Sequence, residues 1–328
     1  MKDYIFSSVY YYIMNHPDIY EFRLDVDESE RIDKLLSNYF PEYSRSTIQR
    51  WISNQDVLID GNPCSQKDKI SSSCNVSIKI TSQPMIELTA EDIDLDIIDE
   101  TDDYIIVNKK SGMVTHIAPG NYTGTLQNAL YFKYPELGLV PRTGIIHRLD
   151  KNTSGIIVIC RNLSSHNILS HQLQDRKFTK LYHSLITRVI DKPITIEEPI
   201  ARHLVNRKKM TVRSNGRYAL SKIRPLSVYK NTSHVEIELI TGRTHQIRVH
   251  LSFIKHPVIG DDVYGYKKSI FNKHQNILNR IDKSFAQYLH AYSLSFTDPK
   301  TKILKTYTAP YPKEYSILLE ELKKNENT

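Results

Sequence analysis

Two short amphipathic helices are predicted near the start of the chain, over residues 31–40 and 45–52. Their apolar residues recur at the i, i+3 and i+4 spacing that gathers side chains on one face of a helix. Arg45 and Arg50 fall on the outward face of the second helix. Two alternating segments follow over 57–62 and 76–80, and the first ends in an Asp-Gly turn signal. We therefore expect two helices and a small hairpin to form one compact module.

A longer series of strands is predicted beyond Pro84. Apolar, β-branched runs over 103–109, 145–146, 156–159, 180–186 and 235–240 are typical of buried or half-buried strands. Helices are expected after Ser164 and Thr244, each of which is a suitable N-cap. In the segment 180–186, alternation places Tyr182 on the opposite face from the two leucines, where it would border a cleft. An ordinary half-buried sheet tyrosine fits the same pattern.

The pattern divides the 328-residue chain into an extension of unknown structure over 1–20, a small domain over 21–83 and a large domain over 84–328. A formal net charge of +7 suits a polyanionic partner. No apolar run approaches the roughly 18 residues of a membrane span, and the start does not resemble a signal peptide. We therefore expect a cytoplasmic protein without a membrane partner. The three cysteines are widely spaced, and the histidines show no ligand spacing, so no metal site is expected.

The most unusual segment is a polar turn between the apolar runs at 145–146 and 156–159. It holds a cation, a carboxylate and two hydroxyls within a few residues, with Asp150 at its centre. Core strands that pin both ends of such a turn would present its side chains rigidly, as binding and catalytic sites require. An ordinary hydrogen-bonded turn, in which Asp and Asn cap the local backbone, accounts for the pattern about equally well.

The amino-acid sequence of this turn favours a catalytic role. His-Arg-Leu-Asp-Lys-Asn-Thr-Ser-Gly over 147–155 resembles the signature of the RluA/RluD-type large-subunit ribosomal RNA pseudouridine synthases, most of all the RluD members. Two further signatures follow, over 241–250 and 256–261. The N-terminal module is similar to the small RNA-binding domain named after ribosomal small-subunit protein S-four. Lys110 and the segment 115–117 depart from the family's usual Pro and Val-His-Pro, which affects local loop shape rather than the catalytic assignment.

The resemblance implies an α+β catalytic domain, built on a mixed, mainly antiparallel sheet with a central RNA cleft and preceded by the S-four-like domain. It implies Asp150 as the nucleophile, Arg248 as the cation beside it, and Tyr182 as the residue that stacks on the base and is a candidate for accepting its ring proton. The implied substrate-binding residues are Arg148, Ile247, Arg243 and His245. The implied RNA-binding residues are Arg45, Arg50, Arg202, Lys208 and Lys209.

Isomerising uridine to pseudouridine involves no redox change and no net hydrolysis, so no cofactor is expected. The enzyme is expected to be a monomer. Its expected partner is RNA, foremost large-subunit ribosomal RNA. Asp150 either attacks the sugar carbon or promotes elimination to a glycal. As an alternative, Arg248 forms an ion pair that only supports the fold. The basic stretch around Arg202 is either a clamp on the RNA backbone or a solvated hairpin. Alternative functions are a ribosome-assembly factor with secondary or lost synthase activity, and a glycoside hydrolase, which would need a second carboxylate opposite Asp150.

Overall fold

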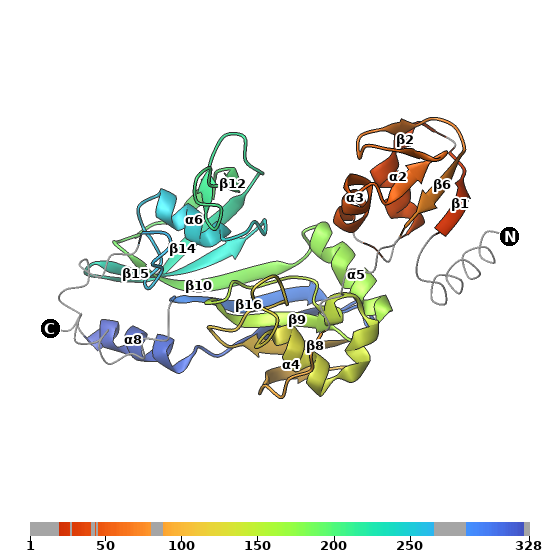
Figure 1. Ribbon diagram of the computed structural model, residues 1–328. Helices are drawn as coiled ribbons and strands as arrows, with labels where there is room; N and C mark the ends of the chain where they lie inside the picture. Colours follow the sequence, from red (N-terminus) through yellow and green to blue (C-terminus); the bar gives the residue numbers. More distant parts are fainter. Residues whose placement is uncertain are drawn as a thin grey trace. The chain divides into compact units, whose positions relative to one another are not determined.

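The computed structural model describes residues 20–26, 28–40, 43, 45–79, 88–265 and 287–324 of the chain. It divides into two compact units, Met1–Glu87 and Leu88–Thr328 (Figure 1). The predicted boundary between residues 83 and 84 lies outside the described residues, as does all but the last residue of the predicted extension. Within the described part of the chain, every helix is too short or too polar to cross a membrane.

The first unit packs two helices against a small antiparallel sheet. The predicted helices are present as α2 (Ile32–Tyr39) and α3 (Arg45–Ser53). The sheet has the order β1 (Tyr20–Leu24), β6 (Cys74–Ile78), β3 (Val57–Ile59) and β4 (Asn62–Pro63), beside a separate pair of β2 (Glu30–Arg31) and β5 (Lys69–Ile70). The predicted pairing of the segments near 57 and 76 is confirmed. Strand β1 was not predicted, since it gains its partner from β6, far along the chain.

The second unit is built on one large mixed sheet. Its strands follow the order β11 (Ile194–Glu197), β14 (Leu220–Tyr229), β15 (Thr232–Leu239), β10 (Thr179–Thr187), β16 (Leu289–Thr297), β9 (Ser154–Cys160), β8 (Tyr104–Lys109) and β7 (Asp96–Glu100), and β17 (Leu304–Thr308) also pairs with β16. Among these described strands, β9 and β16 pair in parallel and the rest pair antiparallel. The predicted mixed, mainly antiparallel sheet is confirmed.

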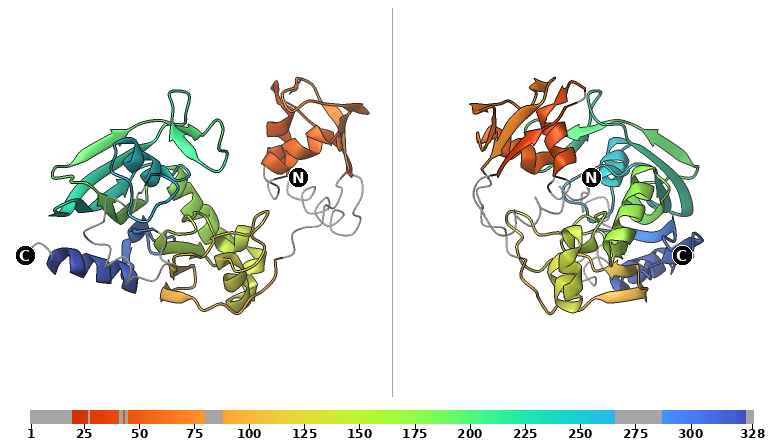
Figure 2. Two further views of the ribbon diagram at one scale, coloured as in Figure 1. Left: turned by 60° about the vertical axis from the view of Figure 1, so that its left-hand side comes forward. Right: turned by 90° about the vertical axis from the view of Figure 1, so that its right-hand side faces the viewer.

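Helices cover both faces of this sheet, which explains its continuous apolar strands. On β8 and β9, Ile105 and Ile157 pack with α4 (Leu126–Lys133), whereas Ile106 and Val158 pack on the side of α5 (Leu163–Gln174). On β10, Tyr182 packs with α6 (Gln246–Phe253) on one face, and Leu185 on the other packs with α8 (Lys313–Lys324). These two helices lie on opposite sides of the sheet (Figure 1 and Figure 2). The predicted separation of Tyr182 from Leu185 is confirmed.

Three local predictions were wrong. Residues 145 and 146 do not form a strand: they follow a 3-10 helix, η2 (Pro141–Gly144), and Ile145 makes a single bridge to Ile159. Helix α5 is capped by Asn162 rather than Ser164, because the Asn162 side chain accepts from the backbone of Ser165. Helix α6 follows His245, not Thr244, and the His245 backbone is left-handed with φ 56°.

Gly155 shows how closely β9 and β16 approach each other at the end of the polar turn. Its φ is +111°, and a Cβ on it would lie 2.3 Å from the carbonyl oxygen of Ala291. A side chain cannot fit at that distance, so this close contact requires glycine. The close contact fixes the point at which the turn enters the sheet.

Candidate active site

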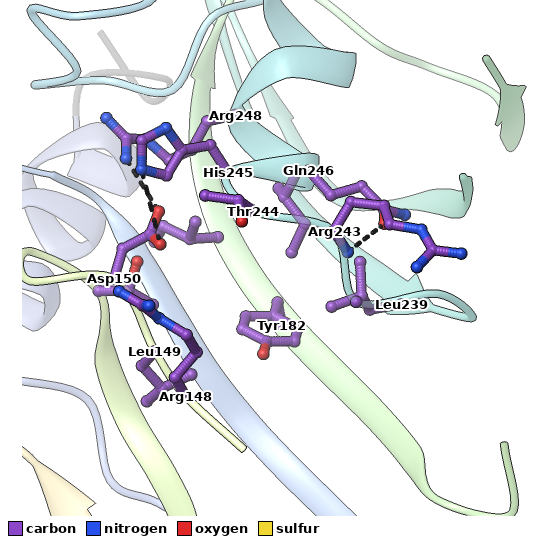
Figure 3. Close-up of a pocket in the computed structure, with 14 residues that line it drawn as sticks. Arg148, Leu149, Asp150, Tyr182, Leu239, Arg243, Thr244, His245, Gln246 and Arg248 are labelled. Carbon is purple, nitrogen blue, oxygen red and sulfur yellow. Dashed lines mark hydrogen bonds and ion pairs between the residues drawn. The ribbon is translucent and has the colours of Figure 1, made fainter. Parts of the chain in front are cut away.

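Four segments far apart in the sequence meet at one pocket of about 100 Å³ (Figure 3). They are the polar turn before β9, the strand β10, the segment that leads from β15 into α6, and the start of β16. The pocket is lined by Arg148, Leu149, Asp150, Thr153, Tyr182, Leu239, Gly242, Arg243, Thr244, His245, Gln246, Ile247, Arg248 and Leu289. The structure therefore brings together all seven residues that the sequence predicted for catalysis and substrate binding.

The backbone around Asp150 is held by the last residue of β8 and by the loop that follows this strand. Thr115 donates from its hydroxyl to the carbonyl of Leu149, at 2.9 Å, and the buried Lys109 donates to the carbonyl of Lys151, at 3.2 Å. Lys109 also donates to the carbonyls of Lys110 and Met113. Burial lowers the pKa of Lys109 to about 7, and the charge of Asp150 opposes that shift. Sequence reasoning missed this lysine, although a charged residue at the end of a buried apolar strand was a usable signal.

Arg248 links Asp150 to a second carboxylate. Its Nη1 donates to Oδ2 of Asp150 at 2.8 Å, while Nε and Nη2 donate to the two oxygens of Asp261 at 2.7 and 3.0 Å. Burial disfavours the guanidinium charge, but hydrogen bonds and charge from Asp261, and then from Asp150, raise the pKa of Arg248 above its ordinary value. Asp150 thus has a permanent positive neighbour whose orientation is fixed by Asp261.

His245 lies near the other carboxylate oxygen of Asp150 and is held by a buried tyrosine. The Tyr264 hydroxyl accepts from the backbone N–H of Met210 at 2.8 Å, so its own proton is free to be donated to Nδ1 of His245, 2.7 Å away. This assignment leaves the proton of the neutral imidazole on Nε2, 3.9 Å from Oδ1 of Asp150. Burial lowers the pKa of His245 and favours the neutral ring, despite the charge of Asp150.

Asp261 and Tyr264 therefore belong to the site, although neither residue had a predicted role from the sequence: Asp261 ends the third signature and Tyr264 follows it. Asp261 pairs with Arg248, and the Arg248 guanidinium lies 4.9 Å from the centre of the Tyr264 ring, in a cation–π contact. The signal that could have found them was a carboxylate and a tyrosine three residues apart, beside an arginine-rich signature.

Tyr182 reaches the pocket from β10 and lies between the Asp150 turn and the segment of Leu239 and Arg243 (Figure 3). The residue is buried, with 8% of its surface exposed. Burial raises the pKa of the Tyr182 hydroxyl well above its usual range, and the charge of Asp150 adds to that effect. The side chain at neutral pH is therefore a protonated phenol that offers a flat apolar ring to the pocket.

The five residues predicted to bind RNA lie outside this pocket. In the first unit, Arg45 is half exposed, but its guanidinium donates to the fully buried Asp33 at 3.1 and 2.9 Å. Its predicted outward orientation is thus only partly right, whereas Arg50 is exposed as predicted. In the second unit, Arg202 and Lys208 are exposed and Lys209 is half-buried, all on the hairpin of β12 (Ile200–Arg202) and β13 (Met210–Val212).

Comparison with known proteins relates both units to RNA-modifying enzymes. Residues 103–253 match the family model described as RNA pseudouridylate synthase, and residues 30–73 match the model of the S4 domain. The chain is 36% identical over 297 residues to ribosomal large subunit pseudouridine synthase D of Pseudomonas aeruginosa, which covers 90% of this chain and 93% of that protein. The protein of the same name from Escherichia coli K12 is 36% identical over 299 residues, 90% of this chain and 91% of the relative.

A solved structure shares the fold of the second unit. Human RNA Pseudouridylate Synthase Domain Containing 1 superposes with a TM-score of 0.53 at 25% identity, over 71% of this chain and 96% of the human one. The segment that matches the family model, residues 103–253, includes Asp150, Tyr182 and Arg248.

Proposed function

Because the chain belongs to the RNA pseudouridylate synthase family, we propose that it isomerises specific uridines of large-subunit ribosomal RNA to pseudouridine. The observation that carries this proposal is the 2.8 Å pairing of Asp150 with Arg248 inside a pocket that Tyr182 also lines. The two bacterial relatives bear the name of that ribosomal activity and align with about nine-tenths of this chain. They give no support to the alternative of an assembly factor that has lost its activity.

Asp150 is the proposed nucleophile. Its Oδ2 is occupied by Arg248, while Oδ1 lies 3.9 Å from His245, too far for a hydrogen bond, and so is the oxygen available to a substrate. Arg248 places a permanent positive charge beside this carboxylate, whose side chain is 20% exposed. Attack of Oδ1 on the sugar carbon and promotion of an elimination to a glycal both fit this arrangement.

The remaining pocket residues are proposed to hold the detached base. Extruding a uridine from an RNA stack costs a few kcal/mol, which stacking on an aromatic side chain offsets in part. Tyr182 would stack on one face of the base and Ile247 would pack on the other. Arg148 would contact the extruded nucleotide, and Arg243 and His245 line the same pocket.

Five cations outside the pocket are proposed to bind the surrounding RNA backbone. Arg202, Lys208 and Lys209 would contact phosphates near the pocket, and Arg45 and Arg50 would do so in the S-four-like domain. In this proposal the domain over 21–83 selects RNA, the domain over 84–328 modifies it, and the enzyme acts as a monomer in the cytoplasm.

Asp150→Asn tests the proposal with little change of shape. An amide is a poor nucleophile but still accepts the hydrogen bond from Arg248, so the variant should fold and bind RNA within a few-fold of wild type. The measurement is pseudouridine sequencing of ribosomal RNA from cells that lack the protein, complemented with either form. We expect wild type to restore the missing sites and D150N to restore none. Restoration by D150N would overturn the role of Asp150, and an unchanged pattern in cells without the protein would overturn the ribosomal substrate.

A further inference from the structure

The hairpin of β12 and β13 carries two adjacent aliphatic side chains that point into solvent at its tip. Leu204 is 75% exposed and Val205 is 87% exposed. Single exposed aliphatics are common on proteins, but this pair lies within a basic surface. No acidic residue occurs between Pro199 and Ala219, a segment that also contains Arg202, Arg207 and Lys208. The tip is therefore apolar at its centre and cationic around it.

The backbone of this tip is held in place by its own hydrogen bonds. His203 Nδ1 accepts from the backbone N–H groups of Val205 and Asn206, at 3.2 and 3.1 Å. The Asn206 side chain accepts from the N–H of Lys208 at 3.1 Å, and the His203 N–H donates to the carbonyl of Lys209 at 3.0 Å. These bonds present both aliphatic side chains outward, instead of letting the loop fold them back onto the protein.

The base of the hairpin is attached to the helix that supplies Arg248. Met210 packs on a buried cluster that includes Val249 of α6 and Tyr264, and its N–H donates to the Tyr264 hydroxyl. The other side of β12 is closed by Gly216, where a Cβ would lie 2.6 Å from the backbone of Ile200. The hairpin is thus a rigid arm whose base touches the residue that orients His245 in the pocket.

The combined chemistry of the tip fits RNA better than a protein surface. Proteins that distort nucleic acid insert apolar side chains such as Leu between base steps and pair the flanking phosphates with Arg and Lys. The stacked faces of bases are apolar and match the apolar centre of this tip. The RNA backbone is anionic and matches the cationic rim. An extruded uridine leaves its neighbours without a stacking partner, and an apolar side chain can cover the exposed ring.

We propose that Leu204 and Val205 form an apolar wedge that enters the RNA base stack beside the target uridine, while Arg202, Arg207 and Lys208 bind the adjacent phosphates. This inference rests on the proposed function, since it assigns the wedge to the extrusion step that precedes isomerisation. The wedge contributes before any bond is broken. Its effect should therefore depend on how firmly the target uridine is stacked.

The test compares the full-length L204S/V205S variant with the matched control I303S/L304S, which alters another exposed aliphatic pair, 61% and 67% exposed, outside the site. Two short RNAs are made from a stem-loop that wild type modifies, one with the target uridine paired and one with it bulged. On the paired RNA we expect the single-turnover rate of L204S/V205S to fall about ten-fold or more, with a change of less than about two-fold on the bulged RNA. The control should match wild type on both.

A second readout does not depend on turnover. In the inactive Asp150→Asn background, 2-aminopurine next to the target uridine should brighten on binding, and the brightening should be lost when Leu204 and Val205 are also replaced. An equal loss of rate on both RNAs, an unchanged rate on the paired RNA, or undiminished brightening would overturn the wedge. The bulged RNA reports the proposed function separately, since its modification needs Asp150 but not the wedge.

Discussion

The guanidinium of Arg248 donates a 2.8 Å hydrogen bond to Asp150, a residue 98 positions earlier in the chain. The same guanidinium is held from behind by Asp261, whose side chain is 1% exposed. One arginine therefore sets the position of the proposed nucleophile and neutralises a carboxylate that water cannot reach. Activity and stability are expected to depend on this residue for different reasons, which substitutions can separate.

Arg248→Lys should keep the positive charge but lose most of the activity, because an ammonium cannot bridge two carboxylates as a planar fork does. Arg248→Ala should in addition lose about 3–5 kcal/mol of stability, since Asp261 is left buried without a counter-charge. Single-turnover rates and thermal unfolding of the two variants distinguish these effects. If the lysine variant has the rate of wild type, Arg248 has only a structural role.

Tyr182→Phe should bind RNA within a few-fold of wild type, because the phenyl ring keeps the flat apolar surface. Tyr182→Ala should weaken binding by about 1–3 kcal/mol, the range measured for loss of a base-stacking aromatic. If the hydroxyl accepts the ring proton, the phenylalanine variant should cleave the glycosidic bond normally but remove that proton more slowly afterwards. Filter binding and analysis of quenched intermediates measure the two effects, and equal affinities of both variants would argue against stacking.

Stability should fall as the pH drops below about 6.5, the ordinary value for histidine. Burial lowers the pKa of His234 to about 3 and of His290 to about 4, with further lowering by His183 and, for His234, by Lys323. The unfolded chain takes up protons first, so each histidine removes about 1.4 kcal/mol of stability per pH unit between 6.5 and its folded pKa. Above pH 6.5 the full contribution of the neutral rings is present.

His234→Phe should make this pH dependence shallower, because the phenyl ring fills the same space beside His183 and Tyr315 and cannot be protonated. Thermal melts from pH 8 to pH 4 measure the slope. Replacing the exposed His171 with Asn is the control and should leave the slope unchanged. Parallel curves of melting temperature against pH for wild type and H234F would show that protonation of His234 does not cause the loss of stability.

Removal of residues 1–87 should leave a folded catalytic unit, because the apolar clusters of the second unit are formed within residues 88–328. The truncated protein should retain turnover on short RNAs but bind ribosomal RNA more weakly. Circular dichroism checks the fold, and a loss of cooperative unfolding would contradict the independence of the unit.

In the full chain, Arg50→Gln should weaken RNA binding alone. Arg45→Gln should also destabilise the first unit, because the buried Asp33 loses one of its hydrogen-bond partners.

Local sequence pattern located strands such as β8, β9 and β10, but it did not predict others, among them β7, β14 and β16. Asp150 was singled out by the family resemblance, because the local pattern fits an ordinary turn about equally well. Runs such as 156–159 are apolar because helices cover both faces of β9, so their burial could be inferred from composition. His245 shows where such reasoning fails. Its left-handed backbone is unfavourable for histidine and is maintained by the tertiary contact with Tyr264, so no local rule would place the helix start there.

Long-range neighbours were also beyond local prediction. Asp261 lies in a recognised motif, yet its partner Arg248 could be identified only once α6 and the following loop were placed in space. The pairing of β1 with β6 has the same origin, since each strand is short and gains its hydrogen bonds from a distant segment. Residue type indicated which groups were chemically capable, and tertiary structure determined which of them meet.

The place of β16 in the sheet links the order of synthesis to the completion of the pocket. β9, which follows the Asp150 turn, and β10, which carries Tyr182, are neighbours of β16 rather than of each other. A nascent chain has no β16 until residues near 297 have been translated and have left the exit tunnel, so the two sides of the pocket lack the strand that joins them. We therefore expect a chain that has not yet supplied β16 to be inactive toward RNA, because the Asp150 turn and Tyr182 are not yet joined in one sheet.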